Sequence, residues 1–401
     1  MESSGWTKGC FFLHIKFIFM IVRCAMSECF IKCAVIIPIY KQNLNLYEMF
    51  SVRRNVDVLS SYPIIFLMRA DIDEAFYMKE FPSVFIKKID SRFFQSFQSY
   101  NRLLLSTFFY DLWREYQKIL ICQTDVIVLS DRLAEFVGLD YDYIGAPLVK
   151  LERDRPILYG GNGGCSLRDI QSCLLFLRKH HLEAEMWTDN EDEFFSYYGV
   201  RYSCEFKVAP VRYAAAFAFD RFSRFLYEFN NASLPFALHG WYTYDAEYAQ
   251  ILARKGNIND VPQVFSGNVS EKRYELQSFL QSGKYVVLYG AGIWGKALAR
   301  YLKLLQINVA AFVVSDTQTI KDNKYLNIPL YHLSLLPYAA DEIAAIIAVS
   351  SRAMSVGGYD SICANVKTRG ITHVLYADVV LYNMAMENWL LECRDSGDNY
   401  E

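Results

Sequence analysis

The stretch KILICQTDVIVLSD contains two short apolar runs that are separated by a polar break. The runs at 119–122 and 126–129 have the length of buried β-strands. The break contains Gln123, Thr124 and Asp125. We therefore expect Asp125 at the end of a buried strand, where a carboxylate needs a hydrogen-bond network, a cation or a metal ion. A turn-capping role is the alternative, because Asp is common in turns between strands.

Apolar runs alternate with helical spacing along the first part of the chain, from 29 to 265. The pattern predicts strands at 33–39, 64–68, 85–87, 119–122, 126–129, 206–210 and 214–219. It also predicts three helices: one that ends near 58–61, one over 100–116, and one that runs from Arg168 to His180 and His181. The second of these helices would bury Phe108, and the third would bury Leu182. Strands that alternate with helices predict an α/β fold with a mostly parallel sheet, whose ligands bind at the carboxyl ends of the strands. Tyr40, Lys41 and Asp125 are expected at such ends.

A second α/β pattern begins at Lys284, after a linker at 266–283 that contains a short helical stretch. Strands are predicted at 285–289, 309–314, 343–349 and 373–376. Gly290, Gly292 and Gly295 follow the first of them and open a helix, and Asp316 follows the second. This order is that of a Rossmann unit, in which the glycines approach a phosphate and the acid binds a ribose. We expect a small Rossmann-like module at 284–380 that binds NAD(P) or a sugar nucleotide, followed by a tail at 381–401; a purely structural role is the alternative.

The N-terminal segment 1–28 has an uncertain status. Its apolar part, 10–22, is interrupted by His14 and Lys16 and is shorter than the roughly 20 residues that span a bilayer. Met26 lies just before the first convincing strand, so we interpret the segment as a translated extension upstream of the true start. A signal peptide and an interfacial anchor are the alternatives.

Composition narrows the class of protein. Of 401 residues, 53% are hydrophobic and 16% aromatic, which is typical of a globular chain with room for two cores. The 41 Lys and Arg side chains nearly balance 44 acids, giving a net charge of −3. This balance argues against nucleic acid as a partner. Ten cysteines occur without any C-x-x-C motif, which favours reduced thiols and a cytoplasmic setting.

Three further stretches contain candidate site residues. Asn162, Gly163 and Gly164 lie in a glycine-rich loop whose backbone can approach a ligand, or which forms a tight turn. Asn190 and the acids at 191–193 open a predicted helix, either as N-terminal caps or as the location of a general base. His239 adjoins Gly and Trp, which suits a metal ligand beside a sugar-stacking ring; a core histidine is the alternative.

An ordered set of motifs resembles an uncharacterised family of GT-A-type glycosyltransferases over about 230 residues. The motifs are Pro38-x-Tyr40-Lys41, Tyr100-Asn101, Gln123-Thr124-Asp125, YDYIGAP at 141–147, GNGGCSLR at 161–168, NEDEFF at 190–195 and PFALHGW at 235–241. The set also resembles, more distantly, the Fringe-like inverting transferases. The second unit is similar to small nucleotide-binding modules of polysaccharide-biosynthesis proteins.

The resemblance implies a GT-A-like domain at 29–265 that binds a nucleoside-diphosphate sugar. It implies that Asp125 and His239 bind Mn²⁺ or Mg²⁺ and that Asp192, or Glu191, is the general base. Residues of the donor site would be Pro38, Tyr40, Lys41, Asn101, Gln123, Thr124, Asn162, Gly163, Gly164 and Trp241. Where such families have Asp-x-Asp, this chain has Gln123-x-Asp125, which removes one carboxylate from the expected metal site.

The expected function is metal-assisted transfer of a sugar to a hydroxyl of a glycan or lipid-linked acceptor, in surface glycan or polysaccharide synthesis. A divalent ion would stabilise the departing diphosphate and a carboxylate would activate the hydroxyl, which gives inversion; retention stays open. Two alternatives remain: a sugar-nucleotide-binding or scaffold protein with weakened catalysis, and an NAD-dependent sugar-nucleotide enzyme that uses the second unit. Peripheral membrane contact and homo-oligomerisation stay open as well.

Overall fold

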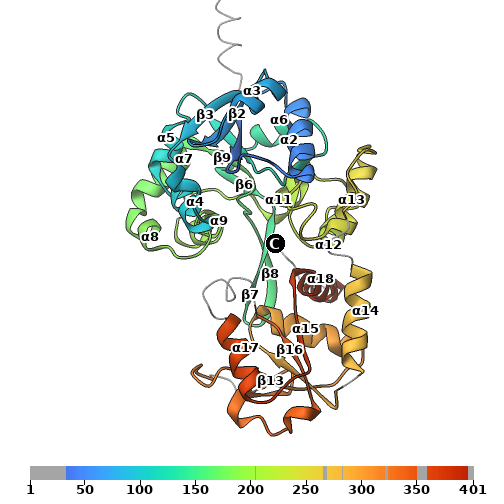
Figure 1. Ribbon diagram of the computed structural model, residues 1–401. Helices are drawn as coiled ribbons and strands as arrows, with labels where there is room; N and C mark the ends of the chain where they lie inside the picture. The colour runs from blue at the N-terminus through green and yellow to red at the C-terminus, as the bar shows by residue number, and fades with distance from the viewer. Residues whose placement is uncertain are drawn as a thin grey trace, which may run out of the picture.

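The computed structural model describes residues 33–203, 205–264, 269–281, 283–320, 324–349 and 359–395. The N-terminal segment 1–28 and parts of the expected linker therefore lie outside the described residues. Figure 1 shows two lobes, each built on its own sheet, with the hairpin β7–β8 and helix α18 between them. We use "first lobe" for β1 to α13 and "second lobe" for α14 to α18. The fold class is α/β, as expected, whereas the domain boundaries drawn from the sequence stay predictions.

The first lobe contains a six-stranded sheet in the order β3-β2-β1-β4-β9-β6. Its strands are β1 (Cys33–Ile39), β2 (Ile64–Arg69), β3 (Phe85–Ile89), β4 (Lys118–Cys122), β6 (Tyr143–Gly145) and β9 (Cys165–Asp169). Strands β1 to β4 pair in parallel, and β9 pairs antiparallel with both β4 and β6. The mostly parallel sheet is thus confirmed. Alternate residues of β1 enter two separate cores, which explains why its sequence is apolar throughout.

A smaller sheet in the order β10-β11-β5 lies beside the main one. It consists of β5 (Ile127–Val128), β10 (Ala218–Phe219) and β11 (Ala237–Leu238), and the hairpin consists of β7 (Pro147–Glu152) and β8 (Arg155–Gly160). The remaining elements of the first lobe are α2 (Leu46–Val58), α3 (Ala75–Glu80), η1 (Ser91–Phe94), α4 (Phe97–Leu104), α5 (Thr107–Asp111), α6 (Leu133–Val137), α7 (Ile170–Lys179), α8 (His181–Met186), α9 (Glu191–Glu193), η2 (Phe194–Tyr198), α10 (Gly199–Tyr202), α11 (Val211–Phe217), α12 (Ser223–Phe229) and α13 (Ala246–Lys255).

The second lobe contains a six-stranded sheet in the order β14-β15-β13-β12-β16-β17. Its elements are α14 (Val269–Leu280), β12 (Tyr285–Tyr289), α15 (Ile293–Leu304), β13 (Val309–Val314), β14 (Lys324–Tyr325), β15 (Ile328–His332), η3 (Leu333–Leu335), η4 (Ala340–Glu342), β16 (Ile343–Ile347), α17 (Tyr359–Thr368), β17 (Val374–Tyr376) and α18 (Val379–Asp395). All strands except β14 run parallel, with the first strand, β12, in the middle. This is the order of a doubly wound sheet. The four strands predicted here from the sequence are confirmed.

Several predicted elements of the first lobe are wrong. The helix expected over 100–116 is two short helices, because Ser106 caps a new helix by accepting from the Phe109 N–H at 3.3 Å. Phe108 is consequently 45% exposed instead of buried. Arg168 belongs to β9, and α7 starts only at Ile170 and ends before His180.

The helix that follows, α8, carries Leu182, which is exposed and not part of the core. The strand expected at 206–210 is reduced to a single bridge between Tyr143 and Val208. The strand expected at 214–219 is helix α11 up to Phe217, because Pro210 starts a helix and three successive alanines continue it.

The residues 381–395, expected to be part of a tail, form most of helix α18. This helix buries Leu381, Met386 and Trp389 and packs against α15 and α14 of the second lobe and α12 of the first. Its core is continuous with that of the first lobe. The two lobes are therefore joined by packed apolar side chains as well as by the chain itself.

Two findings concern membrane-spanning helices and the state of the cysteines. Among the described residues, no helix combines the length and hydropathy needed to cross a bilayer. The described cysteines are Cys33, Cys122, Cys165, Cys173, Cys363 and Cys393, and all six are free thiols.

Two carboxyl groups from different lobes cap the same helix. The N–H of Ser223 donates to Asp245 Oδ2 at 2.9 Å, and the N–H of Phe225 donates to Glu387 Oε1 at 2.9 Å. Burial raises the pKa of Asp245 to about 6. Burial and the charge of Asp245 raise the pKa of Glu387 to about 8. Near neutral pH, Glu387 therefore keeps its proton at the junction of α12 and α18.

Glu387→Gln is expected to stabilise the protein at pH 8 and to change little at pH 5. Folding raises the pKa of Glu387 from 4.5 to about 8, so the folded protein binds the proton more tightly. The free energy of unfolding therefore falls as the pH rises between these values, and a neutral amide removes this loss while still accepting from Phe225. Thermal unfolding at both pH values measures the effect. Glu392→Gln, on the exposed side of the same helix, serves as the control, and an equal response of both variants to pH would contradict the prediction.

Candidate active site

Two strand ends of the main sheet meet at one edge. Strand β1 ends before Tyr40 and Lys41, and the parallel strand β4 ends before Gln123, Thr124 and Asp125. This edge borders two adjoining cavities of about 640 Å³ and 380 Å³, which we call the large and the small pocket. Both are lined by Phe97, Tyr100, Gln123 and Asp125. The expected position of a ligand site at the carboxyl ends of the strands thus coincides with real cavities.

The small sheet brings Asp125, Asp220 and His239 together. Asp220 follows β10 and His239 follows β11, and the His239 N–H donates to the carbonyl of Phe219 at 2.8 Å. Because β11 pairs antiparallel with β5, His239 also lies beside the segment that precedes β5, which contains Asp125. His239 Nε2 lies 3.4 Å from Asp125 Oδ1, and His239 Nδ1 lies 2.8 Å from Asp220 Oδ1.

The two carboxylates, Asp125 and Asp220, favour a positive charge on or beside the His239 ring. Burial alone would lower the pKa of His239, but the charges of Asp125 and Asp220 raise it well above its ordinary value. Burial alone would raise the pKa of Asp125, but the nearby charge of His239 is the main opposing cause and the pKa is lowered overall. Both ring nitrogens of His239 and the Oδ1 atom of Asp220 are buried without an aligned hydrogen bond. A carboxylate behind an imidazole is the arrangement that orients a metal-binding histidine.

The donor set fits the expected Mn²⁺ or Mg²⁺ ion. Asp125 supplies a carboxylate and His239 an imidazole, and these cations often complete their coordination with water and substrate phosphates. Within the described residues, no group of three or more His, Cys, Asp or Glu side chains is arranged to hold a metal ion. A metal bound here would therefore depend on ligands from the substrate as well as from the protein.

Glu48 organises the small pocket and was not predicted from the sequence. It is 1% exposed at the start of α2, where it forms a capping box with Asn45. Its carboxylate pairs with Lys41 at 2.6 Å, accepts from the Tyr40 hydroxyl at 3.0 Å and accepts from the Thr124 hydroxyl at 3.3 Å. One buried acid thereby holds three of the predicted donor-site residues. A capping box was the only local signal in the sequence for this position.

The glycine-rich loop approaches its neighbours so closely that two of its positions have no room for a side chain. A Cβ atom at Gly163 would lie 2.2 Å from Glu191 Oε1, and one at Gly164 would lie 2.2 Å from His239 Nε2. The loop therefore touches both the acidic segment and the histidine, which only glycine permits. The Gly163 N–H donates to Asp192 Oδ2 at 3.0 Å, and the Gly164 N–H donates to Asn162 Oδ1 at 2.9 Å. These two N–H groups are thus engaged within the protein.

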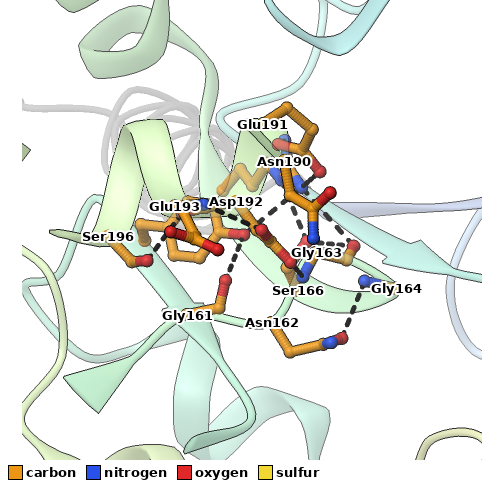
Figure 2. A network of polar contacts seen from close by, with 12 residues as sticks. Gly161, Asn162, Gly163, Gly164, Ser166, Asn190, Glu191, Asp192, Glu193 and Ser196 are labelled. Carbon is orange, nitrogen blue, oxygen red and sulfur yellow. Dashed lines mark hydrogen bonds and ion pairs between the residues drawn. The ribbon is translucent and has the colours of Figure 1, made fainter. Parts of the chain in front are cut away.

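Asp192 lies on the wall of the large pocket, with its carboxyl group directed at the loop (Figure 2). It is 8% exposed and its Oδ1 atom accepts from the Glu193 N–H at 2.8 Å. Burial and the neighbouring Glu191 raise the pKa of Asp192 to about 7, against the opposing hydrogen bond from Gly163. A carboxyl group with such a pKa can accept a proton near neutral pH.

Glu191 is engaged in a buried ion pair with Arg168. The Arg168 side chain is fully buried and donates to both carboxylate oxygens of Glu191 at 3.0 Å. It also donates to the Tyr110 hydroxyl at 3.0 Å and to the Ser166 hydroxyl at 2.9 Å. Of the two acids considered as the base, Glu191 is therefore neutralised by a partner, whereas Asp192 has no cationic partner among the described residues.

The other predicted donor-site residues are divided between the pockets. Pro38, Tyr40 and Thr124 line the small pocket, whereas Asn101 and Asn162 line the large one. Trp241 lines neither pocket: it is 1% exposed and donates from Nε1 to the Ser51 hydroxyl at 2.8 Å. The prediction that Trp241 lies near the sugar is wrong, because its ring packs in the core.

Sequence reasoning missed several residues of the large pocket. Asp220, Arg221, Phe222 and Tyr244 line it from the first lobe, and Tyr382 lines it from α18. Asp220 follows an apolar run in the same way as Asp125 does, so that pattern was an available signal. Nothing local in the sequence marks Tyr382, which reaches the pocket only through the packing of α18 against the first lobe.

The glycines of the second lobe are arranged as expected, but Asp316 is not free. A Cβ atom at Gly295 would lie 1.9 Å from the Gly290 carbonyl oxygen, whereas one at Gly292 would meet nothing within 4 Å. The Asp316 carboxylate accepts from the N–H and the hydroxyl of Ser334, each at 3.0 Å. Nucleotide binding by this lobe stays a prediction, and a ribose would have to compete with Ser334 for Asp316.

Glu191→Gln is expected to lower the free energy of unfolding by about 3–5 kcal/mol, because it leaves the buried Arg168 charge unpaired. Replacing both partners, as Arg168→Met with Glu191→Leu, is expected to cost less than the sum of the two single changes, because no charge then remains buried. Urea unfolding of Glu191→Gln, of the single variants Arg168→Met and Glu191→Leu, and of the double variant measures this. Strictly additive costs would contradict a coupled pair.

Comparisons with known proteins add little to this geometry. A family model described as "Protein of unknown function (DUF5672)" matches residues 83–239, which include Asp125, Asp192 and His239. Among solved structures, the chain is similar to "Crystal structure of a glycosyltransferase involved in the glycosylation of the major capsid of PBCV-1". The identity is 9% and the TM-score 0.32, over 55% of this chain and 98% of that chain. No curated protein matches the sequence.

Proposed function

We propose that the protein is a glycosyltransferase that moves a sugar from a nucleoside-diphosphate sugar to a hydroxyl group. The observation that supports this most directly is the large pocket. Its walls combine the Asp125–His239 pair, which suits a cation and a diphosphate, with Asp192, whose pKa is raised to about 7. These are the two groups that glycosyl transfer with inversion needs, at two parts of one cavity.

The donor would occupy both pockets. The small pocket offers Pro38, Tyr40, Phe94 and Phe97, whose apolar and aromatic surfaces suit a nucleoside base. Asp125 lines both cavities, so the diphosphate would lie beside it and beside His239. A divalent ion bound by these two side chains would supply Lewis-acid stabilisation of the negative charge on the leaving diphosphate.

The chain's own residues would handle the acceptor. Asp192 accepts the proton of the acceptor hydroxyl while the acceptor oxygen bonds to the anomeric carbon. The bond from that carbon to the diphosphate oxygen breaks at the same time, and its electron pair leaves with the nucleoside diphosphate. The Gly163 N–H holds the Asp192 carboxyl group in place, and the Arg168–Glu191 pair fixes the segment that carries it.

The experiment is to incubate the protein with a panel of nucleoside-diphosphate sugars and Mn²⁺ and to follow donor hydrolysis and transfer. Release of nucleoside diphosphate from a particular donor is the expected result. Absence of turnover with every donor would overturn the proposal. Donor binding without turnover would then favour a scaffold protein, and tight NAD binding would favour the NAD-dependent alternative.

Asp192→Asn is expected to lower kcat for transfer by about 10²–10⁴-fold, the usual contribution of a general base, with donor affinity nearly unchanged. In the unaltered protein, kcat/KM should rise with pH up to about 7 and then level off, because Asp192 must lose its proton to act as the base. Asp189→Asn, an exposed acid that lines neither pocket, is the control. Full activity of Asp192→Asn would remove Asp192 as the base.

His239→Ala is expected to weaken the dependence of donor binding on Mn²⁺. Removal of the imidazole leaves Asp125 as the single protein ligand expected at this place. Calorimetric titration of a donor at increasing Mn²⁺ concentration measures the effect without relying on turnover, and His181→Ala on the exposed helix α8 is the control. An unaltered titration would mean that His239 is a core residue.

A further inference from the structure

The lining of the large pocket is not completed by the first lobe alone. Tyr382 of α18 lines this pocket, although it lies some way beyond the predicted transferase region in the chain. Its ring stacks on Trp294 at 4.6 Å between centroids with an interplanar angle of 7°. Trp294 is the second residue of α15, directly after the glycine turn. The second lobe thus presents one of its own aromatic side chains to the candidate active site.

Helix α18 is held against the pocket at several points. The Asn383 side-chain amide donates to the Tyr244 carbonyl at 2.7 Å, and Tyr244 also lines the pocket. Glu387 accepts from the Phe225 N–H, and Phe222 contacts the Tyr382 ring edge-to-face at 6.2 Å. Tyr382 is therefore positioned by ring contacts with Trp294 and Phe222, on a helix that hydrogen bonds of Asn383 and Glu387 hold in place.

The residues that line the large pocket suit a saccharide. Tyr159, Tyr244 and Tyr382 combine ring surface with hydroxyl groups, and Asn101, Asn162 and Gln98 add amides that donate and accept. The Tyr382 hydroxyl has no hydrogen-bond partner among the described residues. A sugar offers the complementary surface, because its C–H faces pack on rings while its hydroxyls pair with amides and phenols.

The charges of the pocket indicate which saccharide fits. Its lining contains five acids, Asp125, Glu191, Asp192, Glu193 and Asp220. Among the described residues that line it, Arg221 is the single Lys or Arg side chain, and it lies beside Asp220 and over the Tyr244 ring. Glu191 is paired with Arg168, Glu193 lies 3.4 Å from Lys150, and Asp125 and Asp220 flank His239, so Asp192 is the acid of this lining that has no cationic partner among the described residues. A carboxylated or phosphorylated acceptor would place a second negative group beside Asp192, so a neutral sugar is favoured there.

We infer that the part of the large pocket lined by Tyr382 is the acceptor site for a neutral saccharide, next to the donor diphosphate at Asp125 and His239, and that Tyr382 of the second lobe binds this acceptor. The inference rests on the proposed function. It gives the second lobe a role in the transferase itself, which does not depend on a nucleotide bound at Gly290–Gly295.

The test compares transfer with donor hydrolysis by water, in the full-length protein, with neutral and uronate-containing oligosaccharides as acceptors. Tyr382→Ala is expected to raise the acceptor KM at least about tenfold, the scale of one lost ring contact and one lost hydrogen bond. Donor hydrolysis and donor KM should stay within about twofold, because Tyr382 does not line the small pocket, where the nucleoside is expected, and has no contact with Asp125 or His239 among the described residues. Tyr274→Ala, an exposed tyrosine on α14 of the same lobe, should leave all three quantities unchanged.

Tyr382→Phe separates binding from folding, because it keeps the ring on Trp294 and removes only the hydroxyl. It should raise the acceptor KM by a few-fold without changing thermal stability. An unchanged acceptor KM in both variants would overturn the inference, and so would a preference for the uronate-containing acceptors. In either case, turnover by the wild-type protein would still uphold the proposed function. Absence of turnover in the wild-type protein with every donor would overturn both.

Discussion

The buried ion pair between Arg168 and Glu191 is the interaction on which the candidate site depends. Arg168 is the penultimate residue of β9 in the main sheet and Glu191 opens the acidic segment, so their two hydrogen bonds of 3.0 Å fasten that segment to the sheet. The glycine loop fits between them because Gly163 has no side chain. With Glu191 neutralised, the adjacent Asp192 is left buried without a cation, and burial raises its pKa toward neutrality.

The same pocket also contains a cluster that favours positive charge, in contrast to Asp192, whose environment favours the neutral form. There, Asp125 and Asp220 lie on either side of His239, and the two carboxylates favour a positive charge on or beside the imidazole. A pocket with a proton acceptor on one wall and a cation-favouring cluster on another has what displacement of a phosphate by a hydroxyl requires. Gln123, in place of a further carboxylate, leaves that cluster with fewer ligands than the related motif has.

The second lobe is not a detached appendage in this structure. Helix α18 lies between the two lobes and packs against elements of both (Figure 1). In addition, Asp154 in the turn of the hairpin β7–β8 forms an ion pair with Lys296 of α15. Glu387 and Asp245 cap the same helix from opposite lobes, so the contact includes buried titratable groups as well as apolar ones. A change in the second lobe would therefore reach the pocket through Trp294, Tyr382 and Phe222.

Local pattern was sufficient for the buried strands, for Asp125 at a strand end and for the glycine turn at 290–295, because periodicity and backbone freedom are properties of neighbouring residues. It failed where distant contacts decide. Trp241 is buried against Ser51 because of how its surroundings pack. The helix at alanines 214–216 and the exposure of Phe108 are a different case, because they follow from helix starts at Pro210 and Ser106 that the apolar pattern did not reveal. The sequence likewise proposed Asp192 and His239, but only the tertiary structure gives them Gly163 and Asp220 as partners and brings Tyr382 to the same pocket. Such pairings join segments far apart in the chain, and no local signal encodes them.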